Sequence, residues 1–310
     1  MKVRVAVPDL ISPSYFPAIA AVELGLFQRQ GIEAEIELIF PVTKSYESLA
    51  TGEIDFVAGA AHAAQYVFAR WQGCQLLCAL SQNTYWFLVL RSDLEPVRGD
   101  LHQLVGLRIV AAPGPRDGLV RMLAEEGIPL SKVELVPVPA ADPKVSFGVS
   151  AAAALKAGSV DGFWANGMAA QIALDSGVGK LVVDARRGDG PVGASDYTFP
   201  ALVAATARIE SEPELMRAAI GAITGAHQLL RQDPELAREA AAPHFPNVER
   251  GLISRLIERD LPFYDAAISR PKIDALNKFS SDLGILTGPP VPYETIVAEQ
   301  FASSWGIPAR

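Results

Sequence analysis

The chain has 310 residues, of which 50% are apolar and 20% charged, and its formal net charge at pH 7 is −8. This length is enough for one large domain or for two smaller ones, each with its own core. The acidic balance argues against general nucleic-acid binding, which needs lysine and arginine to neutralise phosphates. No apolar run approaches the ~20 residues of a membrane span, so we expect a soluble globular protein.

The first 90 residues alternate between predicted strands and predicted helices. Alternating or continuous apolar residues predict strands over 3–7, 32–40, 54–57, 74–80 and 86–90. Apolar residues at helical spacing predict helices over 16–27, 43–50 and 60–70. Strands that are separated by helices predict mostly parallel pairing with right-handed crossovers.

A second series of strands and helices follows the turn-rich segment after Arg91. Strands are predicted over 107–112, 133–138, 160–163 and 181–184, and helices over 116–126, 150–157 and 168–176. A polar, glycine-rich loop over 186–196 leads to an extended segment over 197–205. The rest is predicted to be helical, over 212–231, 234–241, 248–258, 272–283 and 294–303.

This order of elements predicts an α/β protein with two lobes, each a mostly parallel sheet flanked by helices. The first lobe comprises residues 1–91 and 197–310, and the second lobe, 92–196, is inserted into it. The helical C-terminal segment has no sheet of its own, so we expect it to pack on the first lobe. The result is a clamshell with two crossings and a hinge at Ser92 and Asp196.

Several enzyme motifs are missing from the sequence. There is no glycine-rich dinucleotide fingerprint or phosphate-binding loop, and Gly158–Gly162 has its serine in the wrong place for a nucleophile elbow. The four histidines lie far apart, and we predict neither a metal nor a cofactor. Cys74 and Cys78 lie about 13 Å apart on a predicted strand, too far to bridge, and are interpreted as buried apolar residues.

Candidate site residues in the first lobe lie on loops at the carboxyl ends of strands, where open α/β sheets bind ligands. The loop after the first strand offers Asp9, Ser12, Ser14 and Tyr15. His62 follows the third strand, at the start of a predicted helix whose free N–H groups suit an anion. The alternative for His62 is a helix-start residue bonded to its own backbone.

The second lobe and the crossings supply the other candidates, which are Asn83, Tyr85, Gly114, Arg116, Asp117, Trp164, Asn166 and Tyr197. Prolines 113 and 115 have no N–H, so anion capture after the strand 107–112 falls to the N–H groups from Arg116 onward and to the Arg116 side chain. Trp164 and Asn166 offer an aromatic wall and an amide. The alternatives are a solvated Arg116 and a Trp164 that serves only in packing.

Several segments resemble the nitrate/sulfonate/taurine and thiamine-precursor (pyrimidine) group of ABC-importer substrate-binding proteins. The most extensive is Tyr15–Phe27, followed by Gln30-Gly31-Ile32. The others are Leu49–Phe56, Leu104–Val110, Ala154–Gly162, Leu202–Ala205 and Asp233-Pro234-Glu235. Their order and spacing match the group over nearly the whole chain.

The resemblance implies a type II periplasmic-binding-protein fold and a solute-binding protein for a small organic ligand, anionic or heteroaromatic. It further implies an ABC permease and ATPase as partners, a monomer, and a location outside the cytoplasm. The sequence, however, opens on a strand with no signal-peptide pattern ahead of it, which taken literally favours the cytoplasm.

The alternative function is a cytoplasmic enzyme on the same scaffold, acting on an aromatic acid or heterocycle with decarboxylase, desulfinase or pyrimidine-type chemistry. His62 would then be the base and Arg116 the carboxylate clamp. A desulfinase of related fold uses a cysteine in the loop after the first strand, and here Leu10–Ser14 contains none. A cytoplasmic ligand sensor is a third possibility, without a recognisable DNA-binding helix pair.

Overall fold

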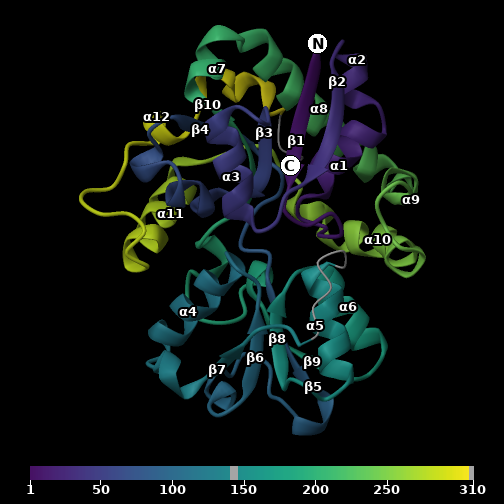
Figure 1. Ribbon diagram of the computed structural model, residues 1–310, viewed down its shortest axis with the longest axis vertical. Coiled ribbons are helices and arrows are strands. Elements are labelled where there is room, and N and C mark those ends of the chain that lie inside the picture. The colour runs from purple at the N-terminus through teal and green to yellow at the C-terminus, as the bar shows by residue number, and fades with distance from the viewer. Residues whose placement is uncertain (140–145, 307–310) are drawn as a thin grey trace. The chain divides into compact units, whose positions relative to one another are not determined.

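The computed structural model describes residues 1–139 and 146–306, which form two compact units (Figure 1). Unit 1 is Met1–Gln82 with Thr198–Arg310, and unit 2 is Asn83–Tyr197. Each unit has a five-stranded sheet of its own. Among the described residues, no helix combines the length and the apolar character needed to cross a membrane.

The sheet of unit 1 has the strand order β2-β1-β3-β10-β4. Its strands are β1 (Lys2–Val7), β2 (Glu33–Leu38), β3 (Phe56–Ala60), β4 (Cys74–Ala79) and β10 (Pro200–Ala205). β1 is parallel to β2 and β3, whereas β10 runs antiparallel to β3 and β4. β3 is buried along its whole length, because helices cover both faces of this sheet.

Helices α1 and α3 follow β1 and β2 and lie on opposite faces of the first sheet (Figure 1). The helices of unit 1 are α1 (Phe16–Glu23), α2 (Leu26–Arg29), α3 (Val42–Thr51), α7 (Thr206–Ser211), α8 (Pro213–Gln232), α9 (Leu236–Ala241), α10 (Asn247–Asp260), α11 (Arg270–Asp282) and α12 (Tyr293–Ile296). The helix predicted over 16–27 divides at Gly25, whose φ of +70° interrupts it. The helical C-terminal segment packs on unit 1, where α8 and α9 contact α1.

The sheet of unit 2 has the strand order β7-β6-β8-β5-β9. Its strands are β5 (Phe87–Arg91), β6 (Arg108–Ala111), β7 (Glu134–Val136), β8 (Gly162–Ala165) and β9 (Gly179–Asp184). Its helices are α4 (Pro115–Glu125), α5 (Phe147–Lys156) and α6 (Gly167–Asp175). β6 is parallel to β7 and β8, and β5 is antiparallel to β8 and β9.

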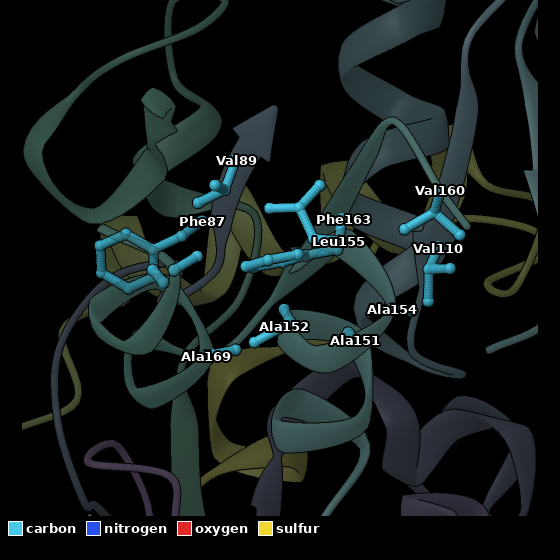
Figure 2. Close-up of a cluster of buried hydrophobic side chains, with 13 residues drawn as sticks. Phe87, Val89, Val110, Ala151, Ala152, Ala154, Leu155, Val160, Phe163 and Ala169 are labelled. Carbon is cyan, nitrogen blue, oxygen red and sulfur yellow. The ribbon is translucent and has the colours of Figure 1, made fainter. Parts of the chain in front are cut away.

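Alanine-rich faces of α5 and α6 pack against the sheet of unit 2 in a buried hydrophobic cluster (Figure 2). Phe163 and Val89 lie in this cluster together with Leu155. The close approach of β5 to β8 requires Gly162, because a Cβ atom there would lie 2.3 Å from Leu90 Cδ2. Small residues at these positions therefore let the helices and strands pack at short range.

The strand predicted over 86–90 belongs to unit 2, and its expected place in the first lobe is wrong. Phe87–Leu90 pair with Gly162–Ala165 of β8. The turn-rich segment after Arg91 resembles a boundary but lies inside unit 2, where the amide of Ser92 donates to Val178 O. Ser92 is therefore not at a crossing. The chain leaves unit 1 after Gln82 and returns at Thr198, two residues beyond Asp196.

The helix predicted over 60–70 is also wrong. The segment forms two short 3₁₀ helices, η1 (Ala61–Tyr66) and η2 (Ala69–Trp71), and the backbone within η2 is left-handed at Arg70 and Trp71. The helix predicted over 294–303 divides into α12 and η9 (Glu299–Ser304). The remaining 3₁₀ helices are η3 (Ser92–Leu94), η4 (His102–Leu104), η5 (Leu130–Lys132), η6 (Ala185–Arg187), η7 (Ala194–Asp196) and η8 (Leu261–Phe263).

Candidate functional site

The carboxyl ends of β1, β3 and β4 lie at one edge of the first sheet, together with the beginning of the antiparallel β10. The loop Asp9–Tyr15 follows β1, and His62 follows β3. Because β1 and β3 are neighbours in the sheet, the two segments leave it side by side. This edge therefore brings the first-lobe candidates into one region of unit 1.

The loop after β1 is compact and mostly buried. The Asp9 carboxylate accepts a hydrogen bond from the amide of Ile11 at 3.2 Å, which forms a tight turn. Ser12 is 1% exposed, and its Oγ has no hydrogen-bond partner among the described residues. Ser14 and Tyr15 are also buried. A buried hydroxyl without a partner is costly, so Ser12 offers a donor that an added ligand can satisfy.

His62 is fully buried and held by Thr198 rather than by its own backbone. Its Nδ1 lies 3.0 Å from Thr198 Oγ1, and the edge of its ring packs on Phe279 at 5.4 Å between centroids. The amide of His62 also donates to Thr198 Oγ1, and the amide of Ala61 donates to Phe199 O. These two amides are therefore committed and the helix is a short 3₁₀ turn, which disfavours the predicted anion site at this helix start.

In unit 2, the turn after β6 also uses its backbone amides internally. The amide of Arg116 donates to Ala112 O at 2.8 Å, and that of Asp117 donates to Gly114 O at 3.1 Å. Gly114 has a φ of +88°, which favours glycine. The predicted capture of an anion by the amides from Arg116 onward is thus wrong for the first two of them. The Arg116 side chain is exposed at this turn.

Trp164 packs against this turn and holds it by a hydrogen bond. Its Nε1 donates to Pro115 O at 2.7 Å, and its ring packs edge-on against Trp86 at 6.1 Å. Both rings are buried, and Gly118 of α4 lies so close that a Cβ atom there would be 2.7 Å from the Trp86 ring. These contacts favour the packing interpretation of Trp164 over an aromatic wall.

Asn166 and Tyr197 likewise have structural contacts. The side-chain oxygen of Asn166 accepts from the amide of Ala169 at 3.0 Å and caps the N-terminus of α6. The Tyr197 hydroxyl donates to the carboxylate of Glu125 at the end of α4. Neither contact is among the sequence-based predictions, although asparagine directly before an apolar helix is a recognisable cap signal.

Arg186 is a candidate that the sequence analysis missed. It follows β9 in η6, is 2% exposed, and its guanidinium carbon lies 5.9 Å from the centroid of the buried Tyr85 ring. Asn83 Nδ2 donates to the carbonyl oxygen of Arg186 at 3.3 Å. The polar, glycine-rich composition of 186–196 suggested a surface loop. Its position directly after a strand was the signal that could have found it.

Hydrogen bonding and burial shift the pKa values of several titratable groups. Hydrogen bonds from Arg108 hold the pKa of Asp161 below its usual range, and burial lowers the pKa of His227 to about 4. Cys74 and Cys78 are free thiols whose pKa values burial raises. Within residues 1–139 and 146–306, no three histidine, cysteine or acidic side chains are grouped to hold a metal.

The two α/β units with their mixed five-stranded sheets define a type II periplasmic-binding-protein fold. A protein of Bordetella bronchiseptica RB50 shares 19% identity and a TM-score of 0.77, over 97% of this chain and 96% of that one. The alkanesulfonate-binding protein SsuA of Xanthomonas axonopodis pv. citri, bound to MOPS, shares 17% identity and a TM-score of 0.71, over 95% and 97%. The periplasmic nitrate-binding protein NrtA of Synechocystis PCC 6803 shares 15% identity and a TM-score of 0.69, over 97% of this chain and 86% of that one.

The family model described as NMT1/THI5 like matches residues 12–237, so the chain belongs to the NMT1/THI5-like family. A search of curated proteins finds no match. The family match and the shared fold confirm the resemblance and the fold class that the sequence analysis gave.

Proposed function

We propose that the protein is a solute-binding protein that captures a small organic ligand, anionic or heteroaromatic, for an ABC importer. Its family and its fold support this role, since SsuA binds alkanesulfonates and NrtA binds nitrate on the same fold. Its partners would be an ABC permease and its ATPase. The observation that carries the proposal is the buried hydroxyl of Ser12, which lacks an acceptor among the described residues at the edge where such folds bind ligands.

In unit 1, the proposed contacts come from side chains, because the nearby amides of Ala61 and His62 are committed. Ser12 donates its hydroxyl hydrogen to the ligand, and His62 stands on the neighbouring loop with its ring fixed by Thr198. A hydroxyl and an imidazole suit an oxyanion or a ring heteroatom. Asp9, Ser14 and Tyr15 shape the loop that presents Ser12.

In unit 2, the proposed contacts are the guanidinium of Arg186 and the ring of Tyr85. A buried arginine offers several N–H donors in a planar fork, which matches a sulfonate or carboxylate group. Arg116 remains a second, exposed candidate at the start of α4. The net charge of −8 does not oppose anion binding, because local donors decide the affinity whereas net charge mainly affects steering.

Calorimetric titration with MOPS, nitrate, an aromatic carboxylate and a pyrimidine tests the proposal. We expect saturable binding of at least one compound, and a stabilisation against unfolding of about 2.7 kcal/mol at a ligand concentration of 100 Kd. The same compounds are incubated with the protein and analysed for turnover. Turnover of any of them with no detectable binder would overturn the proposal in favour of an enzyme.

A further inference from the structure

The segment Phe263–Ala267, between α10 and α11, is fastened to the edge of the first sheet that carries the candidate site. The amide of Ala79 donates to Ala266 O at 2.9 Å, and the amide of Gln82 donates to Phe263 O at 2.7 Å. The Gln82 side chain donates to the carbonyl oxygens of Asp265 and Ala267. This segment is therefore fixed to the residues that follow β4.

Tyr264 extends from this segment to the loop after β1. Its hydroxyl donates to Pro13 O at 2.6 Å, and its side chain is fully buried. Pro13 has no N–H, so its carbonyl oxygen is its only polar backbone group, and this oxygen accepts the hydrogen bond from Tyr264. The Pro13 carbonyl belongs to the peptide that joins Pro13 to Ser14, so the bond from Tyr264 fixes that peptide plane directly. The proline ring restricts φ of Pro13 and carries the constraint back toward Ser12.

The loop also holds its conformation with hydrogen bonds of its own. Within it, the amide of Ser12 lies 3.5 Å from Asp9 O, which is at the limit of a hydrogen bond, and the amide of Tyr15 lies 3.2 Å from Ser12 O. The hydroxyl of Tyr264 adds a donor from outside the loop, at 2.6 Å from Pro13 O. This bond ties the loop to the C-terminal part of unit 1.

His227 of α8 fixes the ring of Tyr264. The two rings stack at 5.4 Å between centroids with an interplanar angle of 30°. His227 Nε2 lies 2.7 Å from Leu80 O, and because a carbonyl oxygen only accepts, this nitrogen carries the proton. Tyr264 is therefore held in place by α8 and by the residues after β4.

We propose that Tyr264 is a positioning residue, whose hydroxyl sets the conformation of the loop Asp9–Tyr15 and thereby aims the Ser12 hydroxyl at the ligand. The binding part of this inference rests on the proposed function, whereas the positioning of the loop does not. Pro13 and Tyr264 lie 251 residues apart in sequence. The C-terminal segment would thus serve the site as well as the core of unit 1.

Tyr264→Phe removes the hydroxyl and keeps the ring on His227. The matched control is Tyr293→Phe, which removes another tyrosine hydroxyl of unit 1 that donates to a backbone carbonyl, Ile268 O, at the same distance of 2.6 Å. Hydrogen exchange of the peptide covering residues 9–15 is the first readout. We expect exchange to accelerate roughly 5- to 20-fold in Tyr264→Phe and to stay at the wild-type rate in Tyr293→Phe.

The dissociation constant for MOPS is the second readout, and we expect a rise of roughly 5-fold or more in Tyr264→Phe alone. Unchanged exchange over residues 9–15 overturns the positioning role, whatever the binding result. Faster exchange with an unchanged dissociation constant would show that Tyr264 orders the loop, and would overturn the proposal that it thereby aims Ser12 at the ligand. If wild-type protein binds no MOPS, the exchange result still decides whether Tyr264 orders the loop. Should Tyr264→Phe not fold, His227→Leu tests the same support by removing the stacked ring.

Discussion

The two units place their candidate side chains by different means. In unit 1, the partners come from distant parts of the chain, since Thr198 holds His62 and Tyr264 holds Pro13. In unit 2, the turn after β6 and the cap of α6 are closed by neighbours three or four residues away, as Arg116 with Ala112 and Asn166 with Ala169 show. The edge of unit 1 therefore depends on the part of the chain from Thr198 onward, whereas in unit 2 such local contacts combine with long-range ones, as Tyr197 with Glu125 shows.

The largest effect that we predict concerns the support from α8 in unit 1. The pKa of His227 is about 4 in the folded protein and about 6.5 when unfolded, so only the unfolded chain binds a proton between these values. Stability therefore rises with pH from about 4 to 6.5 and falls as the pH is lowered through this window. The shift corresponds to about 3 kcal/mol.

His227→Gln removes this titration and keeps a donor for Leu80 O. Urea unfolding at pH 4 and pH 7 should show the stability difference between wild type and variant change by about 3 kcal/mol. Arg231, whose charge also lowers the pKa of His227, is present in both proteins, so the comparison isolates the change at residue 227. A difference that is the same at both pH values would contradict the assignment.

The second prediction compares how much Arg186 and Arg116 of unit 2 contribute to ligand binding. Arg186→Ala should weaken MOPS binding by about 1.5–3 kcal/mol, the range for a hydrogen bond to a charged group. Arg116→Ala should cost less than about 1 kcal/mol, because Arg116 is exposed and screened by solvent. Both variants remove one positive charge, so each controls for the steering effect of the other. Titration calorimetry measures both, and a larger loss in Arg116→Ala would restore the sequence-based choice.

The third prediction concerns the close packing of Gly118 of α4 against the Trp86 ring. Gly118→Ala places a Cβ atom 2.7 Å from the buried Trp86 ring and should destabilise unit 2 by about 2 kcal/mol. Gly251→Ala, in the exposed middle of α10, is the matched control, because a Cβ atom there meets nothing within 4 Å. It should stabilise the protein by about 0.5–1 kcal/mol through helix propensity. Thermal unfolding of both variants tests the sign of each change.

The sequence predicted the secondary-structure elements better than the long-range contacts between them. Hydrophobic periodicity located most strands and helices, and the rule for carboxyl ends of strands located Ser12 and His62. The sequence-based prediction put β5 in the wrong lobe, because a continuous apolar run does not show in which of two sheets the strand is buried. It missed Thr198 and Tyr264, because their contacts join residues 136 and 251 positions apart. Arg186 was hidden by the polar composition of its loop.

The last prediction concerns the proposal that the edge of unit 1 binds a ligand through Ser12. Ser254 of α10 provides a matched control, since its hydroxyl is also buried and has no partner among the described residues. Neither Ser12→Ala nor Ser254→Ala removes a hydrogen bond to a described residue, so both should fold with nearly wild-type stability.

The decisive measurement is calorimetric titration of MOPS into wild type, Ser12→Ala and Ser254→Ala. We predict that Ser12→Ala weakens binding by about 1.5 kcal/mol, roughly tenfold, because it removes a donor to a charged group. Ser254→Ala should bind MOPS as the wild type does. Equal dissociation constants for all three proteins would contradict the claim that Ser12 contacts the ligand.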